Sequence, residues 1–218
     1  MKPTTVIFDM DGLLIDSEPL WEEAGKETLA GFGVSLTDEQ YHFSTGLRTR
    51  EWIDWWFTWF NIDKKHALEA ELAIVQKAIE KIAARGIAMP GVHEVFSLLK
   101  EKGFKIGLAT SSPLALVKVV AEKLQINDYL QAIASAEELK YGKPHPQVYL
   151  DCAAALEVSP LECVCLEDSF NGMIAVKAAR MKCIVIPAKH QQHQTCWDAA
   201  DRKLSSLLQL NEEVLDDL

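Results

Sequence analysis

The sequence lacks any long hydrophobic run, and no apolar segment approaches the ~18 residues of a membrane-spanning helix. Basic residues are also few: 22 Lys and Arg stand against 32 Asp and Glu, for a formal net charge of −10. Proteins that bind nucleic-acid phosphates present a basic face, so this balance argues against a nucleic-acid partner. Asp9 and Asp11 come too early for a secretory signal. We therefore expect a cytoplasmic protein with no membrane partner.

Cysteine is scarce and odd in number. The five cysteines are Cys152, Cys163, Cys165, Cys183 and Cys196, and they lie in or beside apolar segments. In an intracellular chain such residues are usually buried, reduced and hydrophobic in character. Cys163 and Cys165, with two histidines further along, leave a zinc site as the alternative. Two residues on one strand with no second close pair make a poor zinc site, so the structural role is favoured.

Short β-branched and aromatic runs recur along the chain, with helical stretches between them. The expected strands are residues 4–8, 105–109, 132–134, 163–166 and 183–186. The expected helices among the later strands are residues 92–102, 113–124, 146–156 and 170–179. Strands that alternate with helices of this length predict an α/β fold with a doubly wound parallel sheet.

The connection between the first two strands is much longer than the others and contains no convincing strand. Ser17 is a plausible helix N-cap, and residues 37–40 fit a capping box. Asp63 could open a long helix that runs to Arg85. An α-helical cap domain inserted into the α/β core is the simplest interpretation. The expected division is a core of residues 1–16 and 86–218 and a cap of residues 17–85.

Polar side chains stand directly after the expected strands. They are Asp9, Asp11, Thr110, Ser111, Ser112, Lys143, Glu167 and Asp168. The carboxyl ends of parallel strands meet at one edge of a sheet, where sites form. Asp9, Asp11 and Asp168 would repel one another there, so we expect a hard divalent cation such as Mg²⁺ among them.

The same edge offers groups that favour an anion. Ser112 is expected as the N-cap and Pro113 as the first residue of the following helix, whose backbone N–H groups and dipole attract negative charge. Thr110 adds a hydroxyl, and Lys143 adds a positive point charge for phosphoryl oxygens. The constellation predicts a phosphoryl-transfer site.

In order and spacing these motifs resemble the haloacid dehalogenase (HAD) superfamily of phosphatases. Residues 9–12 with 16–18 are similar to its first motif and hinge, Thr110 with Ser111 to its second, Lys143 to its third, and residues 166–169 to its fourth. The resemblance covers the whole chain and includes the cap that marks the β-phosphoglucomutase-like subgroup. It implies a Rossmann-like HAD core and a phosphatase for small sugar phosphates: hexose, 2-deoxyhexose or hexitol phosphates.

The resemblance also implies roles for the acids. Asp9 would be the nucleophile that forms an aspartyl-phosphate, and Asp11 would be the general acid and base. Mg²⁺, with Mn²⁺ or Co²⁺ as substitutes, would be held by the Asp9 carboxylate, the Asp11 backbone carbonyl and Asp168. Glu167 would support these ligands from behind.

Substrate would be held by both domains. The expected ligands are Asp9, Asp11, Thr110, Ser111 and Lys143 on the core, and Glu18, Gly46 and Arg48 on the cap. A cap that closes over the substrate excludes water and sets specificity. For Arg48 a structural role on the cap is the alternative. The stripe Trp52, Trp55, Trp56 and Trp59 predicts the cap interior, with stacking on a sugar as the alternative.

Three functions remain open. In a gapless alignment from the first motif, the cap histidine of the mutases falls at Trp21, which cannot transfer that proton, and Glu18 with Pro19 suits the hinge of the phosphatases. Hydrolysis is therefore favoured over a β-phosphoglucomutase-type isomerase. A noncatalytic sugar-phosphate-binding module is the third possibility. No dimer surface is evident in the sequence, so we expect a monomer.

Overall fold

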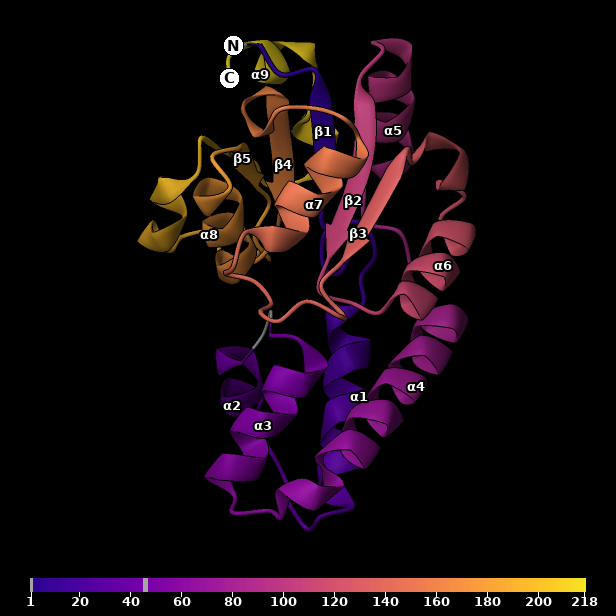
Figure 1. Cartoon of the computed structure of the whole chain (residues 1–218), viewed down its shortest axis with the longest axis vertical. Coiled ribbons are helices and arrows are strands. Elements are labelled where there is room, and N and C mark those ends of the chain that lie inside the picture. Colours follow the sequence, from indigo (N-terminus) through magenta and orange to yellow (C-terminus); the bar gives the residue numbers. More distant parts are fainter. Residues whose placement is uncertain (1, 45–46) are drawn as a thin grey trace.

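The computed structural model describes residues 2–44 and 47–218. Its strands form one parallel six-stranded sheet (Figure 1). The strands are β1 (Thr5–Phe8), β2 (Lys105–Thr110), β3 (Ala132–Ser135), β4 (Cys163–Glu167), β5 (Lys182–Val185) and β6 (Arg202–Lys203). Their order is β3-β2-β1-β4-β5-β6, so β1 lies inside the sheet between β2 and β4. The predicted parallel α/β fold is confirmed. The short edge strand β6 was not predicted, because two exposed residues carry no periodicity.

The helices fall into two groups. Between residues 17 and 85 lie α1 (Glu18–Ala30), α2 (Asp38–Phe43), α3 (Thr49–Trp59) and α4 (Ala67–Arg85). The others are α5 (Val92–Glu101), α6 (Leu114–Lys123), α7 (Gln147–Ala155), α8 (Phe170–Ala178) and α9 (Glu212–Asp216). Figure 1 shows α1–α4 gathered below the carboxyl ends of the strands, apart from the sheet. This arrangement supports our proposal that residues 17–85 are the cap and residues 1–16 and 86–218 the core.

Alternate residues of the buried strands enter two apolar clusters, one on each face of the sheet. On one face Phe8 stacks on Phe96 of α5, with ring centroids 4.8 Å apart. On the other face Ile7 packs with α7, α8 and the cysteines Cys152, Cys163, Cys165 and Cys183, which are free and fully buried. Cys196 is partly exposed. The four buried cysteines are thus structural, and the group of possible metal ligands that converges in the described residues is acidic instead.

Local signals in the cap are partly confirmed. Thr37 and Gln40 form the predicted capping box, with bonds of 2.9 and 3.2 Å between each side chain and the backbone of the other residue. The prediction of one continuous helix from Asp63 to Arg85 was wrong in its first turn. The Asp63 carboxylate accepts from the Lys65 backbone N–H at 3.0 Å and so caps a separate 3₁₀ turn, and α4 begins only at Ala67.

The tryptophan stripe of α3 is only half buried. Trp52 and Trp56 are 7% and 2% exposed, whereas Trp55 and Trp59 are 44% and 65% exposed. The prediction that all four lie in the cap interior was therefore wrong. The buried face of α3 is rotated toward Ile53 and Phe57, which turns the other two indoles toward solvent.

Asp201 fastens the edge of the sheet. Its carboxylate accepts from Lys177 at 2.5 Å, from the Cys183 backbone N–H at 2.8 Å and from Lys182 at 3.2 Å. Although burial raises it, the Lys177 ammonium and the Cys183 amide hold the pKa of Asp201 below its usual range. We predict that Asp201→Asn lowers the free energy of unfolding by about 1–2 kcal/mol near neutral pH.

The pH dependence of this loss follows from the depressed pKa. The contribution of Asp201 is complete above the unfolded pKa of about 4 and disappears as the pH falls through the lower folded value. Urea unfolding should therefore show that the difference between the two proteins shrinks at about pH 3. Asp54→Asn, which removes an exposed pair with Lys64, is the matched control and should cost less than about 0.5 kcal/mol. An undiminished difference in acid would contradict the assignment.

Candidate active site

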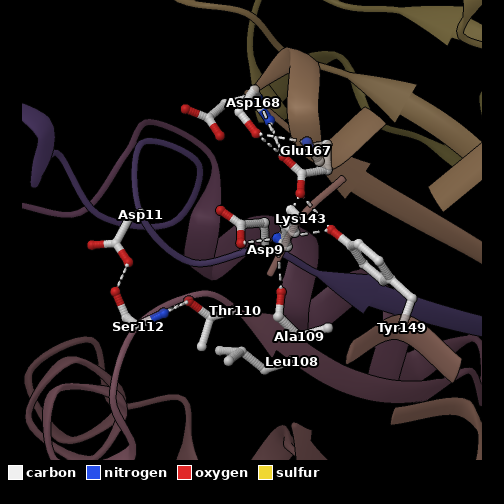
Figure 2. Close-up of polar contacts among 12 residues, drawn as sticks. Asp9, Asp11, Leu108, Ala109, Thr110, Ser112, Lys143, Tyr149, Glu167 and Asp168 are labelled. Atoms are coloured by element: carbon white, nitrogen blue, oxygen red, sulfur yellow. Dashed lines mark hydrogen bonds and ion pairs between the residues drawn. The ribbon is translucent and has the colours of Figure 1, made fainter. Parts of the chain in front are cut away.

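Asp9 directly follows β1 and is 7% exposed. Its Oδ1 accepts from Lys143 Nζ at 2.5 Å (Figure 2). Burial raises the pKa of Asp9 to about 7, with the Lys143 ammonium opposing the rise and Glu167 adding to it. Within the described residues Oδ2 has no hydrogen-bond partner. The Asp9 carboxylate is thus buried and held through Oδ1, while Oδ2 is not bonded to any described residue.

Lys143 is the hub of the buried charges. In addition to its bond with Asp9, Lys143 Nζ donates to Glu167 Oε1 at 2.6 Å, to the Tyr149 hydroxyl at 3.1 Å and to the Ala109 carbonyl at 3.2 Å (Figure 2). Although burial lowers it, the carboxylates of Asp9 and Glu167 raise the pKa of Lys143 above its usual value. The lysine therefore remains a cation and neutralises part of the acid cluster.

Tyr149 is a functional residue that the sequence analysis missed. Its hydroxyl donates to Glu167 Oε1 at 2.5 Å, and burial raises its pKa well above the ordinary value, so it remains a donor. The available signal was its place on the helix that follows Lys143. An aromatic residue in an apolar helix is read first as core, however, and only the fold shows that the hydroxyl meets Glu167.

Both oxygens of Glu167 are occupied by the protein. Oε2 accepts from the backbone N–H groups of Asp168 and Ser169 at 3.1 and 3.2 Å and from the Ser169 hydroxyl at 3.0 Å. Gly172 leaves space for this carboxylate, since a Cβ there would lie 1.8 Å from Glu167 Oε1. Glu167 thus holds Lys143 and the start of the Asp168 loop together.

Three donors converge on Asp11. Ser17 Oγ and the Trp21 indole Nε1–H donate to Oδ1 at 2.7 and 2.9 Å, and Ser112 Oγ donates to Oδ2 at 2.6 Å. Ser17 stands at the expected N-cap position of α1, but its hydroxyl makes no capping bond because it is turned to Asp11. Trp21 lies on α1, so a cap helix orients this acid. From the sequence, Trp21 was named as the position where the mutases carry their cap histidine, and its bond to Asp11 was not predicted.

The start of α6 differs from the prediction. Pro113 is the N-cap and the helix begins at Leu114, so assigning Ser112 as N-cap and Pro113 as the first helical residue was wrong. The Ser112 backbone N–H donates to Thr110 Oγ1 at 3.0 Å, while its hydroxyl goes to Asp11. Next to these, Ser111 Oγ is buried without a partner in the described residues and lines the pocket. An orphaned hydroxyl beside Thr110 fits an anionic ligand.

The surroundings of the Asp168 carboxylate show whether this acidic group suits a metal ion. Its carboxylate has no donor among the described residues, and burial, together with Asp9, Glu167 and Glu18, raises its pKa well above the usual value. One ligand atom each of Asp9, Glu167 and Asp168 lies within 4.8 Å of the others. Gly12 makes room for it, since a Cβ there would lie 2.1 Å from Asp168 Oδ2. A partly buried carboxylate with no protein donor, beside two buried carboxylates, fits a hard cation such as Mg²⁺.

A pocket that is open to solvent lies between the cap helices and this edge of the sheet. Among its lining residues are Asp9, Asp11, Glu18, Trp21, Arg48, Trp52, Thr110, Ser111, Lys143 and Asp168. Burial and the neighbouring Asp11 and Asp9 raise the pKa of Glu18 to about 8. The fold therefore brings together the predicted site residues with two exceptions. Glu167 lies behind the pocket, and Gly46 lies outside the described residues.

Comparisons with known proteins show the family of the chain. The family model of haloacid dehalogenase-like hydrolases matches residues 3–180. Hexitol phosphatase B of Escherichia coli K12 is 46% identical over 213 residues, 96% of this chain and 95% of that protein. The phosphorylated carbohydrates phosphatase of Thermotoga maritima is 32% identical over 175 residues, 80% of each chain. The crystal structure of CbbY from Rhodobacter sphaeroides in complex with phosphate covers all of both chains, with a TM-score of 0.84 and 26% identity. The chain belongs to the haloacid dehalogenase-like hydrolase family.

Proposed function

We propose that this hydrolase is a Mg²⁺-dependent phosphatase of small sugar phosphates, with hexose, 2-deoxyhexose or hexitol phosphates as the substrate class. One observation carries the proposal: Asp9 lies between the Lys143 ammonium and the unpaired Asp168 carboxylate at the floor of a pocket that the cap covers. The similarity to a hexitol phosphatase and to a phosphorylated carbohydrates phosphatase supports it. We expect the enzyme to act as a monomer in the cytoplasm.

The first step is attack by Asp9 on phosphorus. The new bond joins the carboxylate oxygen to phosphorus, and the bond from phosphorus to the sugar oxygen breaks. Asp11 donates a proton to the leaving sugar oxygen. Lys143, Thr110 and Ser111 hold the nonbridging oxygens as charge spreads over them.

The second step is hydrolysis of the aspartyl-phosphate. Asp11, now a carboxylate, takes a proton from a water molecule that attacks phosphorus, and the bond to Asp9 breaks. The Trp21 indole N–H is a donor only, so it orients Asp11 but cannot accept a proton from a sugar hydroxyl. This difference favours water over a second sugar as the acceptor.

The Asp9 carboxylate, the Asp11 backbone carbonyl and Asp168 would hold the Mg²⁺. The ion, when bound, lowers the repulsion between the carboxylates and the incoming phosphate. Mn²⁺ or Co²⁺ would fit the same oxygen ligands. On the cap, Glu18 and Gly46 are the proposed contacts to the sugar, whereas the Arg48 guanidinium bonds to backbone carbonyls of the core.

Replacement of the nucleophile tests the reaction. We predict that Asp9→Asn lowers phosphate release from hexose, deoxyhexose and hexitol phosphates by at least ~1,000-fold, because an amide is a poor nucleophile. Asp16→Asn changes an exposed acid of the same loop and is the matched control. With β-glucose 1-phosphate, accumulation of glucose 6-phosphate instead of free phosphate would establish the mutase and overturn the choice of hydrolysis.

Metal removal tests the acid cluster. Excess chelator should abolish phosphate release, since Asp9 and Asp168 then repel an anionic substrate, and added Mg²⁺ should restore it. Calorimetric titration of the wild type and of Asp168→Asn with Mg²⁺ reports binding without relying on turnover. Full activity in chelator, or equal Mg²⁺ affinity of the two proteins, would refute the assignment of Asp168.

The contact from the cap to Asp11 is tested by Trp21→Phe. This change keeps an aromatic ring but removes the N–H donor, so we expect kcat to fall by about 10-fold, the value of one hydrogen bond, with a smaller change in KM. Trp59→Phe makes a similar change on the exposed surface of α3 and should leave kcat unchanged. An unaltered kcat in Trp21→Phe would show that the indole does not position Asp11.

A further inference from the structure

Arg48 lies at the N-terminal end of α3, and its guanidinium reaches across to a loop of the core. Nη1 donates to the backbone carbonyls of Ala136 and Leu139 at 2.9 and 2.5 Å. Nη2 donates to the Lys140 carbonyl at 3.3 Å and to Glu51 Oε1 at 2.6 Å. The side chain is 9% exposed. A cap residue is thus buried against the main chain of the core.

Glu51 completes the contact from the same turn of α3. Its Oε1 also accepts from the backbone N–H of Gly142, and its Oε2 accepts from the backbone N–H of Arg48, both at 3.3 Å. Gly142 permits the close approach, because a Cβ there would lie 2.7 Å from Arg48 Nε and 2.9 Å from Cγ and Cδ. The Arg48–Glu51 pair therefore fits the loop as one unit, with both a donor and an acceptor.

The loop that this pair holds, residues 136–142, leads directly into Lys143. We propose that Arg48 and Glu51 are positioning residues: they latch the cap to this loop and so hold Lys143 in place when the cap covers the pocket. The part of the proposal that concerns turnover rests on the proposed function, in which Lys143 holds the phosphoryl group. The latch itself rests on the contacts alone.

Two features distinguish a latch from a permanent bond or a substrate contact. Four of the five guanidinium N–H groups are used by the protein, which leaves little of Arg48 for a sugar phosphate. The fifth, at Nε, is buried without a partner among the described residues. A buried, unpaired donor disfavours the docked state, so docked and open caps are closer in free energy than a fully paired contact would allow.

Amide hydrogen exchange of the loop, measured on the full-length protein without substrate, tests the latch. Arg48→Lys keeps the charge but loses the planar fork, and Gly142→Ala pushes the guanidinium away without changing the cap. Both should speed exchange within residues 136–142 by about 10-fold. Arg50→Lys is the matched control, because Arg50 lies on the same turn, is exposed and pairs with Glu71. Its exchange should match the wild type.

Turnover of a sugar phosphate gives the second measurement. Arg48→Lys and Gly142→Ala should each lower kcat by about 10-fold, and the double variant should be no slower than the slower single one, since both break one contact. Glu51→Gln should fall in between, because it keeps the acceptor for Gly142. Thermal unfolding shows that each variant is folded, and Glu51→Gln serves if another is not.

Unchanged exchange in Arg48→Lys would overturn the latch, as would additive effects in the double variant. A rise in KM alone, with wild-type exchange, would assign Arg48 to direct substrate contact and also overturn it. Absence of phosphate release by the wild type would refute the proposed function, whereas the exchange measurement would still decide the latch.

Discussion

Two buried carboxylates share one buried ammonium at the carboxyl ends of the central strands, and the rest of the site depends on this arrangement. Asp9 directly follows β1, and Glu167 is the last residue of the neighbouring strand β4, so the parallel pairing itself brings like charges together. In a poorly hydrated interior such a pair is stable only with a cation between them, and removal of one partner leaves an unpaired charge. Lys143 supplies that cation, and Tyr149 and the amides after β4 satisfy the remaining oxygens of Glu167.

In the described part of the chain, Asp168 is left without a basic partner once Asp9 and Glu167 share Lys143, and this carboxylate suits the proposed metal site. Asp168 receives no protein donor among the described residues, which fits a metal ion. The cap supplies what the core lacks: Trp21 of α1 orients Asp11, and Arg48 of α3 holds the loop that carries Lys143. The proposed acid and the proposed phosphate-binding lysine are therefore both positioned from the cap. A site assembled in this way is complete only when it is shielded from bulk water.

Local sequence patterns succeeded where a residue's environment depends on its near neighbours, and failed elsewhere. The β-branched runs predicted five strands, because such residues suit a sheet buried on both faces. Ser17 and Ser112 were expected as helix caps, yet both hydroxyls bond to Asp11. In the sequence, a serine before a helix looks the same whether its hydroxyl caps the helix or bonds to a distant acid. Trp55 and Trp59 share the spacing of Trp52 and Trp56, but which face of α3 is buried depends on how α3 packs against α4.

The sequence by itself therefore determined the parallel α/β sheet, the helical character of residues 17–85 and the group of acids, hydroxyls and lysine at the strand ends. Its ordered motifs were sufficient to indicate the family. Only the tertiary structure decided what those side chains contact. The contacting residues Lys143 and Asp9 are 134 positions apart in the sequence, Ser112 and Asp11 are 101 positions apart, and Arg48 and Ala136 are 88 positions apart. Periodicity and capping are properties of a few consecutive residues, whereas hydrogen-bond partners at such separations follow from how the whole chain packs.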